Sequence, residues 1–135
     1  IRYPDYYGLD MPRLEEFCVF RATIELIRER GMNDLLQRVY EACKLELLKP
    51  KDMMRNCVRD IYKPFSTEEI NQKVAEMLRP EGLKTPVELV FQSIDGLHEA
   101  IPNHHGDWYF TGKYPTPGGT KLCNQAFVNY IDRQK

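Results

Sequence analysis

Apolar residues recur at steps of three and four along the first part of the chain, which is the spacing of a helix with one buried face. The run between Leu14 and Ile27 predicts a helix over residues 12–30, with Asp10 as a capping candidate and Gly31 as its end. The same spacing predicts a second helix over residues 34–48 and a shorter third over residues 51–62. These helices predict a core built from helix faces.

A fourth helix is predicted from Ser66 to Leu78 by a capping pattern as well as by periodicity. Ser66 and Glu69 have the spacing of a capping box, in which each side chain bonds the backbone N–H of the other residue. Ile70 and Val74 belong to its apolar stripe, and the Pro at position 80 follows its end. Residues 1–80 are therefore predicted to be helical.

The pattern changes after residue 80, where branched and aromatic residues favour strands. Residues 87–91 read VELVF and predict a strand, followed by a short helix over residues 94–101. Residues 108–111 predict a second strand, and residues 119–133 predict a closing helix. The expected fold is α+β and mainly α-helical: about four helices over residues 1–80, then a small strand-helix-strand-helix unit over residues 81–135.

Charge and length narrow the classes of partner. The chain has 135 residues, with 19 Lys and Arg against 20 Asp and Glu, and a net charge of -1. This balance does not favour a nucleic-acid partner or a basic membrane-binding surface. No apolar run approaches the roughly 20 residues of a membrane span, and no signal-peptide pattern is present. We expect a cytoplasmic piece of a larger protein, with small molecules or protein as partners.

Cysteine and histidine positions do not favour a metal site. The four cysteines, Cys18, Cys43, Cys57 and Cys123, form no CxxC pair, and we expect them to be buried free thiols. His104 and His105 are adjacent, so their side chains usually diverge, and His98 has no third ligand at a useful spacing.

Two motifs at opposite ends of the chain carry a family resemblance. Residues 1–12 read IRYPDYYGLDMP, and residues 107–117 read DWYFTGKYPTP. Read together and in this order, they resemble the C-terminal part of amidophosphoribosyltransferase, the enzyme that commits phosphoribosyl pyrophosphate to purine synthesis. The resemblance covers both ends well and the middle poorly. Residues 21–64 look like an insertion, which could be core and solvated surface or could cover an oligomer face or a neighbouring domain.

The resemblance also implies which cofactor to expect. One branch of the family binds a 4Fe–4S cluster through three cysteines of these motifs, because thiolates hold such clusters. Asp5, Gly106 and Tyr109 stand at those three positions here. The resemblance therefore implies a member without the cluster, no cofactor within these residues, and Mg²⁺ for the parent enzyme.

The family's catalytic groups are not found in these residues. The resemblance implies an N-terminal cysteine that releases ammonia from glutamine and an acidic pair followed by a Gly- and Thr-rich loop that binds the ribose phosphate. Ile1 is not Cys, and no such acidic pair occurs. We expect no catalytic residue here, and we expect the chain to act with missing glutaminase and phosphoribosyltransferase domains in a homo-oligomer regulated by purine nucleotides.

Four residues are left with a tentative supporting role. By position, Phe17 matches a leucine that lines the family's ammonia channel, but it can equally be an ordinary core residue. Tyr7, Gly8 and Asp10 follow the ribose-phosphate site in the family and could brace it, although helix capping alone would explain Asp10. A self-standing helical interaction module that lacks catalytic domains is the alternative. An independent hydrolase has no nucleophile and base pair to support it.

Overall fold

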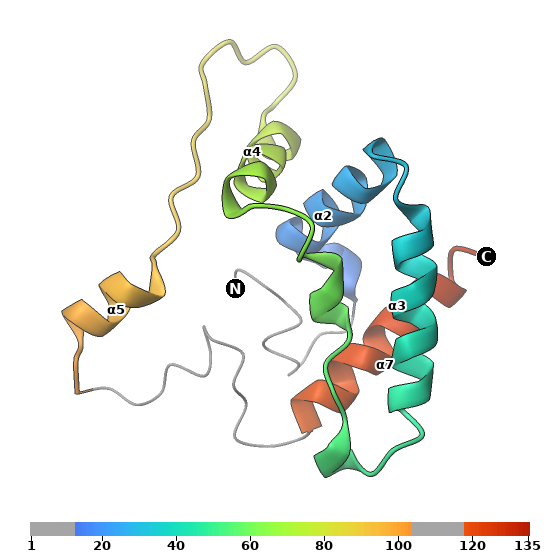
Figure 1. Ribbon diagram of the computed structural model, residues 1–135. Helices are drawn as coiled ribbons and strands as arrows, with labels where there is room; N and C mark the ends of the chain where they lie inside the picture. The colour runs from blue at the N-terminus through green and yellow to red at the C-terminus, as the bar shows by residue number, and fades with distance from the viewer. Residues whose placement is uncertain (1–12, 104–117) are drawn as a thin grey trace.

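The computed structural model describes residues 13–103 and 118–135, and these residues are mainly α-helical, as predicted (Figure 1). Short 3₁₀ helices are labelled η. In chain order the elements are η1 (Leu14–Glu16), α2 (Cys18–Glu29), α3 (Asn33–Glu46), η2 (Lys51–Met53), η3 (Val58–Ile61), α4 (Thr67–Leu78), α5 (Ile94–Ala100) and α7 (Gly118–Asp132).

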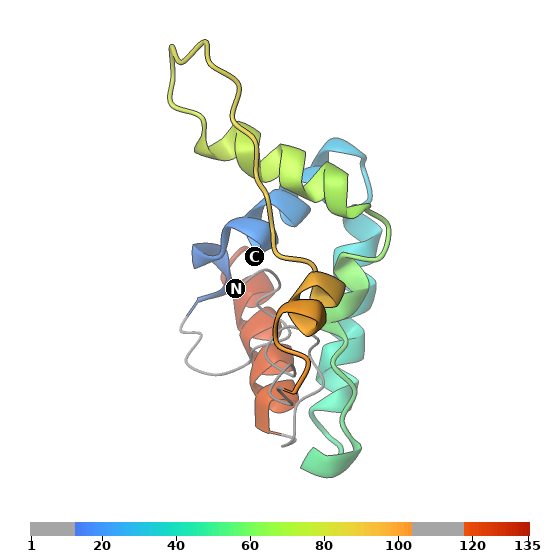
Figure 2. The same cartoon turned by 90° about the vertical axis from the view of Figure 1, so that its left-hand side faces the viewer.

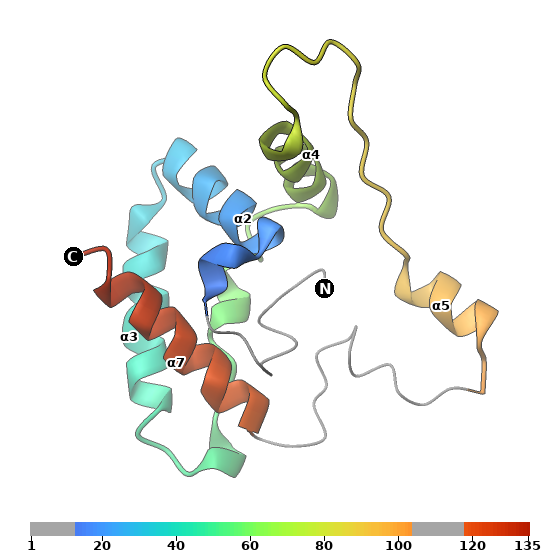
Figure 3. The same cartoon turned by 180° about the vertical axis from the view of Figure 1, so that it is seen from behind.

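One shared core holds most of these helices together. α2 packs against α4 and η1, while α3 packs against α7 and η3, and α7 also contacts η1. From behind, α7 is seen to lie across α3 (Figure 3). Phe20, on α2, is fully buried and meets the rings of Phe127 and Tyr130 edge-on, with centroids 6.3 and 5.0 Å away. The C-terminal helix therefore completes the core of the N-terminal helices.

The turn between α2 and α3 confirms Gly31 as the end of the first long helix. Gly31 has φ 65°, a conformation that side chains with a Cβ rarely adopt. Its N–H donates to the carbonyl of Arg28 at 3.1 Å, and the N–H of Met32 donates to the carbonyl of Ile27 at 2.9 Å. This pair of bonds is the Schellman arrangement, which uses carbonyls that the helix leaves unpaired.

The expected continuous helix over residues 12–30 is wrong at its start. Phe17 has extended backbone angles, φ −91° and ψ 123°, and separates η1 from α2. Because of this break, η1 changes direction from α2 and packs against α7, and its Leu14 is completely buried. Periodicity did not show the break because Leu14, Phe17 and Phe20 keep helical spacing across it.

The expected third helix over residues 51–62 is also wrong. Two 3₁₀ turns, η2 and η3, stand in its place, and Met54 is extended between them. Side chains from elsewhere bond the backbone here: Glu46 accepts from the N–H of Arg55 at 2.8 Å, and Asn124 accepts from the N–H of Cys57 at 3.1 Å. These bonds replace helical ones, so the segment has no need of a continuous helix.

The fourth and last helices agree with the sequence. α4 has the predicted capping box, since Ser66 Oγ accepts from the N–H of Glu69 at 3.1 Å and Glu69 Oε2 accepts from the N–H of Ser66 at 2.7 Å. α7 spans Gly118–Asp132, within one residue of the prediction at each end. On α7, Phe127 and Tyr130 are buried in the core, whereas Leu122 is 39% exposed.

The predicted strand over residues 87–91 is not formed, and no strand occurs among residues 13–103 and 118–135. The segment from α4 to α5 is irregular, and no ladder partner lies beside it in the described part of the chain. Figures 1 and 2 show it passing from the end of α4 down to α5, which has no buried residue. The second predicted strand, residues 108–111, lies outside the described residues.

Candidate functional site

Phe17 is the one tentative site residue that falls within the described chain. Its ring is half-buried and packs against the hydrophobic core, at the break between η1 and α2. Its carbonyl accepts from the N–H of Arg21 at 3.0 Å, and its own N–H donates to the carbonyl of Leu14 at 3.0 Å. Half-burial fits either role, because a core residue at the rim and a residue shared with a neighbouring domain both keep part of their surface open.

The other named positions lie outside the described residues. These are Tyr7, Gly8 and Asp10, expected to brace the ribose-phosphate site, and Asp5, Gly106 and Tyr109, at the cluster-cysteine positions. Their roles stay predictions.

A buried carboxamide joins three separate parts of the chain. Asn124, on α7, has no exposed surface. Its Oδ1 accepts from the N–H of Cys57 at 3.1 Å and from the thiol of Cys43 at 3.5 Å, and its Nδ2 donates to the carbonyl of Arg55 at 2.9 Å. Sequence reasoning missed Asn124, although a polar residue beside Cys123 on the apolar face of a helix was a signal for it.

The thiols at this junction are part of the core. All four cysteines are free, as predicted; Cys43, Cys57 and Cys123 are buried, whereas Cys18 is only half-buried. A hydrogen bond with Cys57, together with burial, raises the pKa of the Cys43 thiol well above its ordinary value. Such a thiol stays protonated at neutral pH, and a protonated thiol is a poor nucleophile and a poor metal ligand.

Glu46 supports the same region from the end of α3. Its carboxylate accepts from Lys49 Nζ at 2.6 Å and from the backbone N–H of Arg55 at 2.8 Å. These two bonds hold the pKa of Glu46 below its ordinary value, with the Lys49 bond contributing most. Arg55 in turn pairs with Asp60 at 2.9 Å. The polar contacts around residues 54–60 therefore fix the backbone between η2 and η3.

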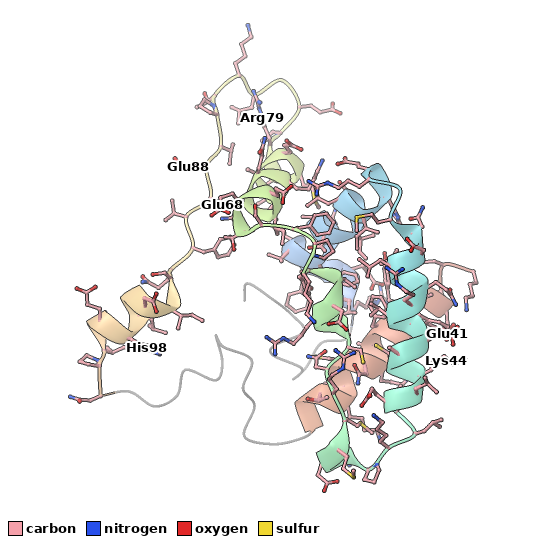
Figure 4. The ribbon with its side chains drawn as sticks, in the orientation of Figure 1. Glu41, Lys44, Glu68, Arg79, Glu88 and His98 are labelled. Carbon is pink, nitrogen blue, oxygen red and sulfur yellow. The ribbon has the colours of Figure 1, made fainter. Side chains whose placement is uncertain are left out.

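A groove lies between α4 and residues 86–89. Its volume is about 480 Å³. The lining residues are Glu68, Asn71, Gln72, Ala75, Glu76 and Arg79 from α4 and the residue after it, and Pro86, Val87, Glu88 and Leu89 from the facing segment. Figure 4 labels Glu68, Arg79 and Glu88 on its two sides. No sequence motif pointed to this groove, because its two walls meet only in the fold.

Several charges near the groove are already paired. Lys73 bonds Glu29 at 2.8 Å and Glu76 at 3.0 Å, which links α4 to α2 and raises the pKa of the Lys73 ammonium. Arg30 pairs with Glu69 and stacks over the ring of Phe65. Arg79 Nε donates to the carbonyl of Leu83 at 2.7 Å.

The carboxylates of Glu68 and Glu88 differ from these groups, because neither has an ion pair or hydrogen bond to the described part of the chain. The groove therefore has unpaired negative charge on both walls.

Searches for other kinds of site gave negative results within the described ranges. No group of three or more His, Cys, Asp or Glu side chains there could hold a metal ion. None of the described helices combines the length and apolar character that a membrane span needs.

Comparison with known proteins gave no relative. No family model, no curated protein and no solved structure matches this chain.

Proposed function

We propose that this chain is the C-terminal part of an amidophosphoribosyltransferase-like enzyme. The parent would transfer ammonia from glutamine to C1 of phosphoribosyl pyrophosphate, release pyrophosphate with the help of Mg²⁺ and form phosphoribosylamine. The segment described here would be structural or regulatory and inactive alone. The proposal includes a cytoplasmic homo-oligomer that lacks an iron–sulfur cluster.

The observation that carries this proposal is the pair of end motifs, residues 1–12 and 107–117, in the order that the family has them. The position of Phe17 adds support. It stands shortly after the first motif, at a break between two helical elements, with its ring partly open. An ammonia channel needs apolar walls, because water along the path would protonate and divert the ammonia; a half-buried phenylalanine suits such a wall.

The direct test is to express the natural reading frame that contains this segment and to measure pyrophosphate release with glutamine and phosphoribosyl pyrophosphate. We expect activity from that protein and none from residues 1–135 alone. If the whole reading frame has no glutamine-dependent activity and none with ammonium, the proposal fails.

Phe17→Ala in the active parent tests the channel role separately. We expect more glutamine to be hydrolysed per pyrophosphate released, because ammonia escapes from a widened wall, while activity driven by ammonium is unchanged. Leu78→Ala is the control, since Leu78 is 52% exposed at the end of α4. Equal coupling in the wild type and Phe17→Ala would assign Phe17 to the core alone.

A self-standing helical interaction module is the second candidate function. The observation in its favour is the shared core, to which α2, α3, α4 and α7 all contribute buried residues. A chain that closes its own core can fold without further domains. The two candidates predict different self-association of the separate chain.

A further inference from the structure

The segment facing α4 has the composition of a strand but no strand partner among the described residues. Residues 86–90 read PVELV, and Val87 and Val90 are 37% and 87% exposed. The backbone N–H groups of residues 87–90 make no hydrogen bond to any described residue. A stretch of backbone whose N–H groups are unpaired can serve as the template for an added strand.

The groove gives such a strand room on one side of this segment. A paired strand lies about 4.8 Å from its neighbour, and its side chains alternate between the two faces. The cavity of about 480 Å³ between residues 86–89 and α4 is large enough to admit side chains of an added strand. Ala75 is the small residue on the α4 wall, and Leu89 adds an apolar contact opposite.

The charge of the groove selects the side chains of its occupant. Among the described lining residues, Glu68, Glu76 and Glu88 stand against one cation, Arg79. Glu76 is already paired with Lys73, so Glu68 and Glu88 supply the free carboxylates. Asn71 Oδ1 is a buried acceptor with no donor in the described structure, and it lies in the same wall. A ligand that brings N–H donors and positive charge satisfies all three groups.

We propose that this groove binds an extended peptide segment that carries Lys or Arg side chains and pairs with residues 86–90 as an added β-strand. Backbone bonds to residues 87–90 supply a generic affinity, and the pairs with Glu68 and Glu88 supply selectivity for basic sequences. A second copy of the same segment fits less well, because residues 86–90 bring another Glu88 and no cation. This inference does not depend on the proposed enzyme function.

The test uses the 135-residue chain and a short, capped, fluorescently labelled peptide in which valine alternates with arginine. We expect anisotropy to report saturable binding that weakens as salt is added, because exposed ion pairs are screened. A peptide of the same length with glutamate in place of arginine should not bind. An N-methylated version of the arginine peptide, which keeps the charge but cannot donate backbone bonds, should bind weakly or not at all.

Two variants separate the two contributions. Glu68→Gln combined with Glu88→Gln should weaken binding about five- to tenfold, the effect of losing two exposed ion pairs. Val90→Pro removes one unpaired backbone N–H at an exposed position and should weaken binding while circular dichroism stays unchanged. Glu41→Gln, an exposed carboxylate of α3, is the matched charge control and should bind like the wild type.

Four results would overturn the proposal: no saturable binding of the arginine peptide, equal binding of the glutamate peptide, equal binding of the N-methylated peptide, or equal weakening by Glu41→Gln. Sedimentation of the free chain tests whether a second copy of the chain occupies the groove. A dimer that Val90→Pro dissociates would make a second copy the occupant in place of a basic peptide.

Discussion

Asn124 shows how one side chain can fix several segments at once. Its carboxamide bonds the backbone at Arg55 and Cys57 and the thiol of Cys43, so α7, α3 and the segment before η3 meet at a single buried residue. A buried backbone N–H or C=O without a partner is costly. The irregular path of residues 54–57 therefore depends on a residue far away in the sequence.

Asn124→Ala should lower the free energy of unfolding by about 2–4 kcal/mol, because it leaves the buried N–H of Cys57 without a partner and removes the bond to the part-buried carbonyl of Arg55. Urea denaturation followed by circular dichroism measures this change. The control is Asn129→Ala on the same helix, where Asn129 is exposed and its side-chain Oδ1 accepts from Gln125. A loss of similar size in both variants would mean that Asn124 is not a special junction.

Glu46 predicts a pH dependence. Its bonds to Lys49 and to the N–H of Arg55 lower the pKa of its carboxyl in the folded state below the ordinary 4.5. The folded state therefore binds this proton less readily than the unfolded state, so the carboxylate stabilises the fold above about pH 4.5, and that contribution is lost as pH falls through the lower folded pKa.

The corresponding variant is Glu46→Gln. Its unfolding free energy should fall below that of the wild type at neutral pH, and the gap should close in acid. Urea titrations across the acidic range measure the gap, and Glu41→Gln controls for the loss of one exposed negative charge. A gap that stays constant with pH would show that Glu46 acts by packing alone.

The helices α4 and α5 both begin at a serine cap, but only α4 buries residues in the core. Ser66 caps α4, which buries Ile70 and Val74 in the core, whereas Ser93 accepts from the N–H of Gly96 to cap α5, which buries nothing. Ser66→Ala should lower the unfolding free energy by about 1 kcal/mol. Ser93→Ala should leave it unchanged, because α5 lies outside the core. Equal losses in thermal or urea unfolding would make α5 part of the cooperative unit.

Helices whose signals lie within their own residues could be predicted from the sequence. α3, α4 and α7 were predictable because periodicity and the Ser66 capping box act within the helix itself. The break at Phe17 and the irregular residues 54–57 were not, because α7 determines them through packing on Leu14 and hydrogen bonds from Asn124. The strand prediction for residues 87–91 captured a real preference, but a strand also needs a paired neighbour, which no local pattern reports.

For the site residues too, features that depend on distant segments could not be predicted from the sequence. Phe17 packs against the core and keeps part of its surface open to a neighbour. The groove beside α4 was not predictable, because Glu68 and Glu88 are ordinary exposed carboxylates in the sequence and face one cavity only in the fold. Asn124 was equally hard to recognise, since its partners lie on other segments.

At the scale of the whole molecule, contacts distant in sequence join the two ends of the described chain. Arg133 bonds the carboxylate of Glu15 at 3.0 and 3.1 Å, and Tyr40 donates to Asp132 at 2.7 Å. Arg28 donates to Gln134 at 2.8 Å. The last helix is therefore tied to η1, α2 and α3, whereas α5 has no buried residue and lies outside this core.

Self-association of the chain distinguishes the two candidate functions. Leu45, Leu48 and Met53 are 64%, 83% and 68% exposed, toward the end of α3 and on η2. If these residues face another domain of a parent enzyme, the separate chain exposes that apolar surface and should self-associate in sedimentation experiments. Leu45→Lys with Leu48→Lys should then restore a monomer, whereas Leu78→Lys, 52% exposed on α4, should not. A wild-type chain that is monomeric at high concentration and unfolds cooperatively would instead favour the self-standing module, because its exposed apolar side chains would then need no partner domain to cover them.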